Sequence, residues 1–391
     1  MNSNYQPVEN QNRNKLIEKL IRIAAQGLNE SYLPDQKEFV SKRKIFDNKF
    51  LSENKNARYT LINLIGLHKA ETYDLPIEIN TKNILIHHIA NVDKLKGIGD
   101  LGLLLWATSL VSPADIPKIL TKINFNSILE SYDDAKKKLT TELAWFLIGI
   151  LMASTFSEVF KKSTGDLIQK IYSDLRNNYG ASGIFRHQLK QGFSGKLRAE
   201  ISTFSDQIYP IYALSLYGKQ VKNEEALLIS KECALKLCEL QGKDGEWMWH
   251  YNSKNGSVIN KYPVFSVNQF ALAPFVLSSL QKASNTDFSH FINKGMDWGL
   301  KSSQKSLIDD NKKILWDGIS QNKSKRILTS SFNFLKNSNI KFGNKNKLVK
   351  ECSSYNYGWI LHALVGKTND SNTKFKVDGK QNNSNNIFIL N

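Results

Sequence analysis

Residues 141–153 read TELAWFLIGILMA, a stretch that becomes almost entirely apolar after Glu142. The apolar run from Leu143 to Ala153 is shorter than the ~20 residues that a helix needs to cross a lipid bilayer. A helix of this kind, without a polar face, is instead buried on all sides by other protein segments. The stretch therefore predicts a helix at the centre of the protein.

Five other stretches share this character, being apolar nearly all round and rich in small residues: 58–70, 99–111, 206–218, 267–280 and 355–366. Six amphipathic stretches, with apolar residues at i, i+3 and i+4, alternate with them: 15–28, 81–92, 115–129, 165–177, 224–240 and 288–301. Almost no alternating strand pattern occurs. We therefore predict an all-α fold, an (α/α)6 toroid with six buried inner helices inside six half-exposed outer helices.

The first three inner stretches begin with Arg58, Asp100 and Glu142, which are spaced 42 residues apart. This regularity indicates a helical-hairpin repeat. We expect a single toroid domain over residues 15–366. Residues 1–14 are expected to form a flexible N-terminus, and the Asn-rich residues 367–391 a disordered tail.

The net charge of +17 is uneven, because residues 301–350 hold twelve Lys and Arg against three Asp. A basic surplus suits an anionic partner. No helix-turn-helix, zinc-finger or RNP-like motif accompanies it. We therefore favour a glycan or another anionic small molecule over nucleic acid, and leave open whether residues 301–350 have a partner of their own.

The chain shows no motif for a metal or a cofactor, so neither is predicted. CxxC pairs, HExxH, acidic Ca²⁺ loops, GxGxxG and P-loop spacings are all absent. The N-terminus lacks a secretory signal, and the three cysteines form no disulfide framework. These features predict a cytoplasmic protein without a membrane span. Peripheral membrane contact and the oligomeric state are left open.

Three long connections run from an outer helix to the next inner helix: residues 178–205, 241–266 and 302–354. In an alternating toroid such connections emerge on one face, where the inner helices have their N-termini. Long loops often carry function, and helix N-termini favour anionic ligands. The sequence therefore predicts a binding mouth on this face.

Polar and aromatic residues at this mouth are the candidates for function. Four of them titrate and could act as general acids or bases: Asp206, His187, Glu142 and Asp100. The candidates for substrate binding are Arg58, Arg186, Gln207, Trp249, His250, Tyr251, Tyr262, Asn268, Gln269 and Asn356. Asp and Asn are also common helix caps, so a structural role stays open for each position.

Residues 241–251, QGKDGEWMWHY, concentrate aromatic rings where a loop begins. In an extended chain Trp247, Trp249 and Tyr251 would share one side. Flat rings with polar edges suit a sugar face or an isoprenoid in a mostly apolar pocket. The alternative is a packed loop that covers the core.

The alternating helices resemble the (α/α)6 toroids of terpenoid cyclases, protein prenyltransferase subunits, six-hairpin glycosidases and polysaccharide lyases. Gln241, Gly245 and Trp247 look like the Q-x(3)-G-x-W repeat of triterpene cyclases, in which Gln and Trp tie one hairpin to the next. The resemblance implies a structural role for these three residues. The DxDD and DDxxD motifs of terpenoid enzymes are absent, so no catalytic residue is carried over.

We predict a carbohydrate-active toroid that modifies an anionic or a lipid- or nucleotide-linked glycan by general acid/base chemistry, as a hydrolase, lyase or epimerase. Its setting would be intracellular polysaccharide or glycolipid synthesis or modification. One alternative is a terpenoid or polyprenyl enzyme, which needs a deep apolar cavity with an acid at its base. The other alternative is a non-catalytic toroid that binds a ligand or a protein. Such a toroid would have a filled centre, or carboxylates at the mouth that are all engaged in helix capping.

Overall fold

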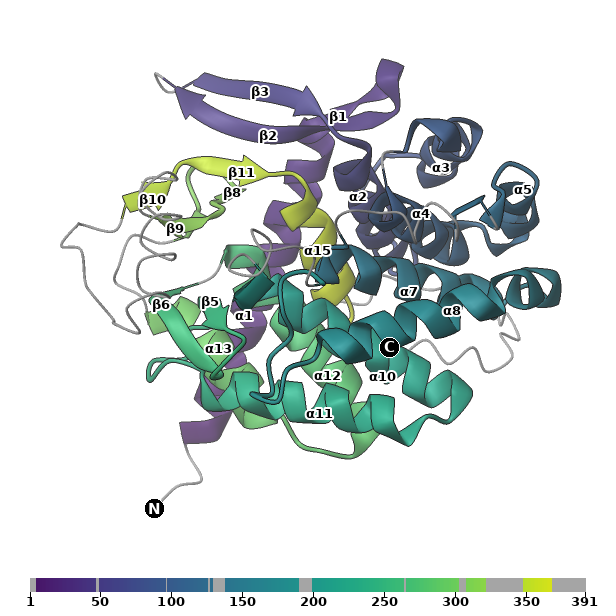
Figure 1. The fold of residues 1–391 in the computed structure, drawn as a ribbon. Coiled ribbons are helices and arrows are strands. Elements are labelled where there is room, and N and C mark those ends of the chain that lie inside the picture. Colours follow the sequence, from purple (N-terminus) through teal and green to yellow (C-terminus); the bar gives the residue numbers. More distant parts are fainter. Residues whose placement is uncertain are drawn as a thin grey trace.

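The computed structural model describes residues 5–46, 49–95, 97–125, 127–128, 138–189, 199–263, 265–301, 307–320 and 347–367. Helices make up most of this part of the chain, and short strands lie at one side of the helical body (Figure 1). The predicted tail, from residue 368 on, and most of the basic segment 301–350 lie outside the described residues.

Six inner helices form a closed ring in the described ranges. They are α2 (Ala57–Glu71), α4 (Ile98–Val111), α7 (Thr140–Ser154), α10 (Ser205–Val221), α12 (Ala273–Ser284) and α15 (Tyr355–Leu364). Each contacts the next in chain order, and α15 returns to α2. A π-helical segment, η4 (Asn268–Leu272), leads into α12, where Pro274 cannot donate a helical hydrogen bond. The predicted toroid is thereby confirmed.

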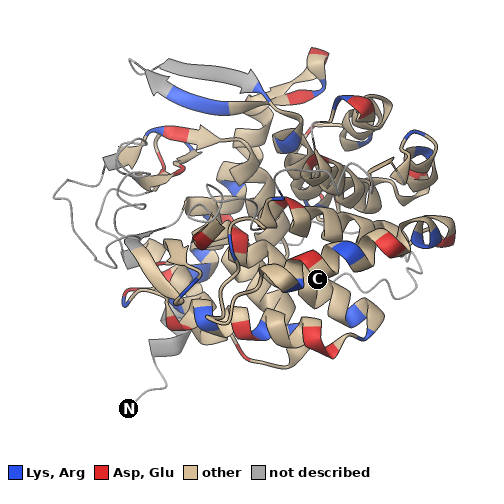
Figure 2. Cartoon of the chain, in the orientation of Figure 1, with Lys and Arg blue, Asp and Glu red and all other residues tan. Residues whose placement is uncertain are grey.

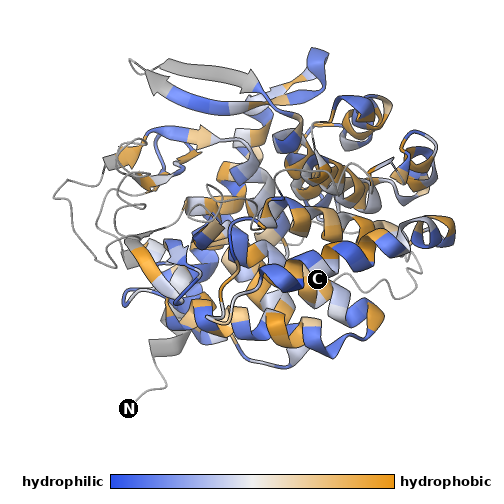
Figure 3. Cartoon of the chain, in the orientation of Figure 1, coloured by the Kyte–Doolittle hydropathy of each residue, from blue (hydrophilic) through white to orange (hydrophobic). Residues whose placement is uncertain are grey.

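Six outer helices cover this ring in the same ranges. They are α1 (Tyr5–Ser31), α3 (Thr81–Ala90), α5 (Ile116–Leu120), α8 (Glu158–Asn178), α11 (Glu224–Glu239) and α13 (Ser289–Lys301). Much of α4 and α7 is hydrophobic, whereas hydrophilic and hydrophobic residues alternate along α8 and α11 (Figure 3). The outer helices therefore bury one face only, as their amphipathic pattern predicted.

Three outer helices differ clearly from their predicted ranges, and one of them, α8, begins at Glu158 instead of residue 165. Helix α1 begins at Tyr5, so the expectation of a flexible segment is wrong for residues 5–14. Arg13 contributes to this order, because its Nε donates to Asp297 Oδ1 of α13 at 2.7 Å. Helix α5 ends at Leu120, because the predicted helix 115–129 is divided by an Asn cap: Asn124 Oδ1 accepts the Ser127 N–H at 3.2 Å.

Strands occupy the connections from outer to inner helices. Helix α2 is preceded by β1 (Tyr32–Leu33), β2 (Glu38–Phe46) and β3 (Lys49–Lys55), and α10 by β4 (Ile201–Thr203). Segment η4 is preceded by β5 (Met248–Asn252) and β6 (Ser257–Pro263). Helix α15 is preceded by β7 (Ile308–Asp309), β8 (Ile314–Leu315), β9 (Gly318–Ser320), β10 (Lys347–Val349) and β11 (Glu351–Ser353). All pairings are antiparallel, and β11 joins β2 from the far end of the chain. All of these strands lie in outer-to-inner connections, which confirms that the long connections gather on one face of the toroid.

Glycines let two pairs of inner helices touch through their backbones. A Cβ atom added at Gly66 of α2 would lie 2.1 Å from the carbonyl oxygen of Gly358 of α15. A Cβ atom at Gly149 of α7 would lie 2.1 Å from the carbonyl oxygen of Gly102 of α4. Both distances are far below van der Waals contact, so only glycine fits. These contacts explain why the inner stretches are rich in small residues.

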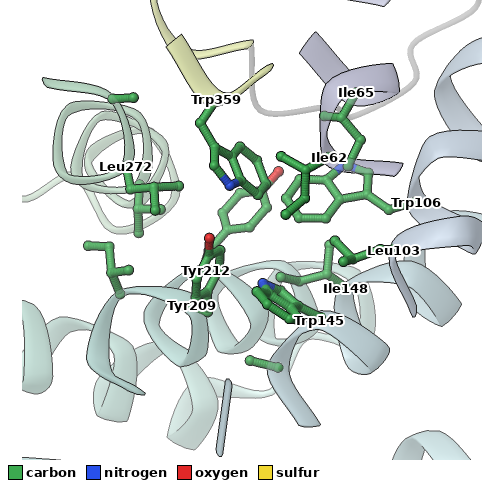
Figure 4. Packing of buried hydrophobic residues seen from close by; sticks show 14 of the residues in the cluster. Ile62, Ile65, Leu103, Trp106, Trp145, Ile148, Tyr209, Tyr212, Leu272 and Trp359 are labelled. Carbon is green, nitrogen blue, oxygen red and sulfur yellow. The ribbon is translucent and has the colours of Figure 1, made fainter. Parts of the chain in front are cut away.

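The centre of the ring is filled by large aromatic side chains (Figure 4). The ring centroids of Trp145 and Tyr209 are 5.2 Å apart, those of Tyr209 and Trp359 are 5.9 Å apart, and those of Trp359 and Trp106 are 5.3 Å apart. Tyr212 packs on the Trp106 ring at 5.7 Å. The toroid therefore has a closed centre between its two ends. No described helix is both long and apolar enough to cross a membrane.

We predict that Gly149→Ala destabilises the protein by about 2 kcal/mol, because the added methyl group overlaps the Gly102 carbonyl and must push α4 and α7 apart. Urea unfolding followed by circular dichroism measures the change. Gly165→Ala in α8 is the matched control, because a Cβ atom there meets nothing within 4 Å. We expect this control to raise stability by about 0.5 kcal/mol. Equal stability of Gly149→Ala and the wild type would contradict the backbone contact.

Candidate functional site

A pocket of about 290 Å³ lies where the inner helices have their N-termini, and we call it the mouth pocket. It is lined by Arg58, Tyr59, Ile62, Thr141, Trp145, Thr203, Phe204, Ser205, Tyr209, Trp249, Phe265, Asn268, Leu272 and Tyr355. Its volume is at the lower end of the ~300–1,000 Å³ range of ligand pockets. The pocket therefore suits a group about the size of one sugar ring.

The inner helices supply this lining in a regular way. Four of them place a polar residue in the first turn and a larger or apolar residue one turn later: Arg58 and Ile62, Thr141 and Trp145, Ser205 and Tyr209, and Asn268 and Leu272. Residues four apart share one face of a helix. The mouth pocket thus has a polar rim above an apolar and aromatic floor.

Arg58 joins two of the predicted acid/base candidates. Its Nε donates to Asp100 Oδ1 at 2.6 Å, and its Nη2 donates to Glu142 Oε1 at 2.8 Å. The guanidinium also lies over the Trp145 ring, 5.1 Å from the centroid. The 42-residue spacing therefore brings together one first-turn residue from each of three successive inner helices.

This cluster is not an open anion site. Two carboxylates face one guanidinium, so the three groups carry a net negative charge when ionised. Burial acts to lower the pKa of Arg58, but Asp100 and Glu142 outweigh burial and raise it. Both carboxylates predicted as general acids or bases are thus paired with Arg58, and their acid/base role stays a prediction.

Asp206 is held by four hydrogen bonds behind the pocket wall. His187 Nδ1 lies 2.8 Å from Oδ2, the backbone and hydroxyl of Thr203 each donate to Oδ2 at 2.8 Å, and Thr141 Oγ1 donates to Oδ1 at 2.9 Å. Thr141 and Thr203 also line the mouth pocket. Asp206 itself is 1% exposed. The structure therefore brings the predicted pair His187 and Asp206 together, one side chain away from the pocket.

Burial acts to raise the pKa of Asp206, but the contact with His187 and the hydrogen bonds from Thr203 outweigh burial and hold the pKa below its usual range. Asp206 therefore stays ionised near neutral pH. An ionised carboxylate that accepts the Nδ1–H of a histidine fixes the tautomer that leaves Nε2 as the basic nitrogen. In this arrangement Asp206 positions the His187 ring.

Gln207 and Gln269, which were predicted to bind substrate, instead use their side-chain amides in hydrogen bonds to backbone groups. Gln207 accepts from the Phe185 N–H at 2.7 Å and donates to the Phe185 carbonyl at 3.0 Å. Gln269 accepts from the Trp247 N–H at 3.1 Å and donates to the carbonyls of Gly245 and Gly295 at 3.0 and 2.8 Å. Both side chains are buried and attach connections to the ring, so neither lies in the mouth pocket.

Asn356 is also buried, and its Nδ2 donates to Asp317 Oδ1 at 2.8 Å. The same carboxylate accepts from the backbone and the hydroxyl of Ser353 at 2.7 and 2.9 Å. Burial raises the pKa of Asp317 despite these donors. Asn356 and Asp317 thus join the connection before α15 to the start of that helix.

Arg186 lies outside the described lining of the mouth pocket. Its Nη1 donates to the Asn177 carbonyl at 3.2 Å, and its Nε lies 3.5 Å from Glu200 Oε1. Asn268, in contrast, is in the pocket wall. Of the predicted binding residues, Arg58, Trp249 and Asn268 are therefore the ones that line the pocket.

The aromatic residues of β5 have different environments. Trp249 is half-buried, lines the mouth pocket and meets Phe265 edge-on at 4.0 Å. Tyr251 is fully buried, which raises its pKa, and His250 is only 8% exposed. Register shifts on both sides of His250 break the alternation that would have put Trp249 and Tyr251 on one side. Tyr262 lies in β6, and its side chain is outside the described residues.

Gln241, Gly245 and Trp247 have the structural role that the resemblance implied. Gln241 Nε2 donates to the carbonyls of Gly245 at 3.0 Å and of Phe291, in α13, at 3.1 Å. Trp247 is 1% exposed and packs against Phe204 at 5.7 Å between centroids. These contacts tie the turn after α11 to the next hairpin.

Several lining residues were not predicted, chiefly Tyr59, Thr141, Thr203, Tyr209 and Tyr355. Tyr59 and Tyr355 form an edge-to-face pair with centroids 4.7 Å apart. The signal that could have found most of them is their place in the first two turns of an inner helix. Within the described ranges, no group of three His, Cys, Asp or Glu could hold a metal ion.

Comparisons with known proteins find the same architecture in solved structures. An unsaturated glucuronyl hydrolase mutant from Streptococcus agalactiae, complexed with dGlcA-GalNAc6S, aligns with a TM-score of 0.58 and 14% identity over 91% of this chain and 92% of its own. A possible member of the GH105 family from Salmonella enterica has a TM-score of 0.56 and 9% identity over 90% and 93%. An unsaturated glucuronyl hydrolase specific for heparin has a TM-score of 0.55 and 13% identity over 90% and 95%.

These structures confirm the α/α toroid fold. At such low identity they bear on the fold alone. No family model matches the chain, and no curated protein matches it.

We predict that Asp206→Asn lowers the free energy of unfolding by about 2 kcal/mol at neutral pH, because it removes a buried charge that accepts four hydrogen bonds. Since the pKa of Asp206 is depressed in the folded protein, this stabilisation is complete above the unfolded-state value of about 3.9. It is lost as the pH falls through the lower folded value.

Urea unfolding of the wild type and the variant from neutral to acid pH measures this difference. The exposed Asp166 on α8 provides the matched control, Asp166→Asn, which we expect to change stability little at any pH. A stability difference for Asp206→Asn that stays constant down to about pH 2 would show that the depressed pKa is wrong.

Proposed function

We propose that this chain is a carbohydrate-active enzyme whose mouth pocket binds one sugar ring of a glycan. The observation that carries the proposal is the lining of that pocket. Trp249 and Tyr59 offer ring faces for the apolar face of a sugar. Thr141, Ser205 and Asn268 offer hydroxyl and amide groups for its hydroxyls. The small volume suits a single ring.

The solved structures with this architecture support the proposal, since two of those above are described as unsaturated glucuronyl hydrolases. We therefore propose a glycan that carries a sugar acid. Its carboxylate would meet the polar rim formed by Thr141, Ser205 and Asn268. Because Asp100 and Glu142 leave the Arg58 cluster with a net negative charge, we expect Arg58 to orient a sugar hydroxyl and not the carboxylate. A lipid- or nucleotide-linked glycan and an intracellular setting stay predictions from the sequence.

His187 is our candidate for the acid/base group. Because His187 lies behind the pocket lining, its Nε2 would act through one bridging water: it would take a proton from the attacking water, and the resulting imidazolium would return a proton to the leaving sugar oxygen. Asp206 would hold the ring through Nδ1 and stabilise the positive charge that forms. Glu142 and Asp100 act in this scheme by positioning Arg58.

A second candidate is a non-catalytic toroid that binds a glycan. It is favoured by one observation: each of the three predicted mouth carboxylates is held by a cation or by hydrogen bonds, and the centre of the ring is filled. The terpenoid alternative has no such support, because no Asp or Glu is among the described residues that line either large pocket.

We predict that Trp249→Ala weakens sugar binding at least tenfold, because it removes the ring face at the pocket wall. Isothermal titration with dGlcA-GalNAc6S, compared with the neutral disaccharide lactose, measures binding and the preference for an acidic sugar. Trp298→Ala on α13 is the matched control, since it also removes a half-buried indole. If the wild type binds neither sugar, or both variants lose affinity equally, the sugar pocket is wrong.

We predict that His187→Gln lowers turnover of dGlcA-GalNAc6S roughly 100-fold or more while binding changes little, since a general acid or base contributes about 10²–10⁴-fold. Mass spectrometry of released monosaccharides measures turnover. His290→Gln, at an exposed position on α13, is the control and keeps wild-type turnover. Binding by the wild type without any release of product favours the non-catalytic toroid. Full turnover by His187→Gln contradicts the assigned role.

A further inference from the structure

A second pocket of about 490 Å³ lies at the opposite ends of the inner helices, and we call it the rear pocket. Residues from the C-terminal halves of α2, α4, α7 and α15 line it, together with Tyr212 of α10, residues of α12 between Phe275 and Lys282, and residues 365–367. The mouth pocket is bordered by Trp145 and Tyr209, and the rear pocket by Trp106. Since these rings pack through Trp359 across the filled centre (Figure 4), the two pockets are separate.

The inner end of the rear pocket is aromatic. Phe275 lies 4.8 Å from Tyr212 and 4.7 Å from His362 between ring centroids. Trp106 lies 5.9 Å from the His362 ring. Both ring nitrogens of His362 are inaccessible to solvent and have no hydrogen-bond partner among the described residues. Burial lowers the pKa of His362 to about 3, so this imidazole is neutral, and its two nitrogens are unsatisfied within the pocket wall.

The outer end of the rear pocket is cationic. Lys69, Lys282 and Lys367 line it, and no Asp or Glu is among its described lining residues. Lys69 Nζ lies over the Tyr73 ring, 5.0 Å from the centroid. Burial and repulsion between these lysines lower the pKa of Lys69 and of Lys367. The three ammonium groups thus face a shared space whose described walls supply no counter-charge, and an anion there would relieve their repulsion.

Helix polarity explains part of this arrangement. Lys69 is in the last turn of α2 and Lys282 in the last turn of α12, where a cation stabilises the negative end of the helix dipole. That effect accounts for a lysine at each helix end. It does not account for a cavity beneath them with an aromatic floor and a neutral histidine whose nitrogens are unpaired.

We propose that the rear pocket binds an organic anion with a flat apolar body and an oxyanion head. The body packs on Trp106 and Phe275, and the head lies among Lys69, Lys282 and Lys367. Phosphate, sulfate and carboxylate share this chemistry. Such a site is independent of the proposed sugar binding at the mouth, since the filled centre separates the two.

Isothermal titration of the full chain with 1-naphthyl phosphate, 1-naphthoate and uncharged 1-naphthol tests the proposal. We expect 1-naphthyl phosphate to bind at least tenfold more tightly than 1-naphthol. Lys69→Gln should weaken the phosphate roughly tenfold, the loss expected for one charge-assisted contact. Comparison of the phosphate with the carboxylate shows which head group the lysines prefer. Ser278→Phe, which places a ring in the pocket, should weaken both anions.

Lys243→Gln is the matched control, because Lys243 is exposed and lies in the turn after α11, away from the rear pocket lining. We expect it to leave binding unchanged. Addition of dGlcA-GalNAc6S should not displace 1-naphthyl phosphate, whether or not that sugar binds at the mouth. Equal affinity for 1-naphthol, an equal loss in Lys243→Gln, or no binding at about 1 mM would each overturn the proposal.

Discussion

Backbone contact between inner helices sets the geometry on which the rest of the molecule depends. Gly102 and Gly149, like Gly66 and Gly358, allow neighbouring helices to approach until a carbonyl fills the space of a missing side chain. Helices held so closely have little freedom in axial position. Their first turns therefore meet at one level, and residues distant in sequence, such as Arg58 and Glu142, become neighbours at the mouth.

The helical frame could be predicted because its signal is local. An apolar or amphipathic stretch shows its burial within a few turns, whatever it packs against. The strands lacked such a signal. Three consecutive charged residues, Lys42 to Lys44, obscure any alternation in β2, and one of its partners, β11, is about 300 residues further along the chain. Pairing over such a distance leaves no pattern in either segment alone.

The candidate site was predictable in place but only partly in its residues. Asn268 and Gln269 are adjacent at the start of one helix. Asn268 lines the mouth pocket, whereas Gln269 accepts a hydrogen bond from the backbone of Trp247 in the connection before that helix. Sequence cannot separate these roles, because capping and ligand binding select the same polar side chains. Tyr59 and Tyr355 were missed for the opposite reason. They begin apolar stretches, where a tyrosine looks like part of the core.

The glycine contacts also bear on how the protein can move. Helices that touch through their carbonyls cannot slide or turn past one another without a clash, so α2 with α15, and α4 with α7, must each move as one unit. The strand-bearing connections make fewer such contacts, and segments of this kind open at a lower free-energy cost than a packed core. We therefore expect β4, β5 and the neighbouring connections to be the segments that change conformation when a ligand binds at the mouth. The inner helices keep their positions while these connections move.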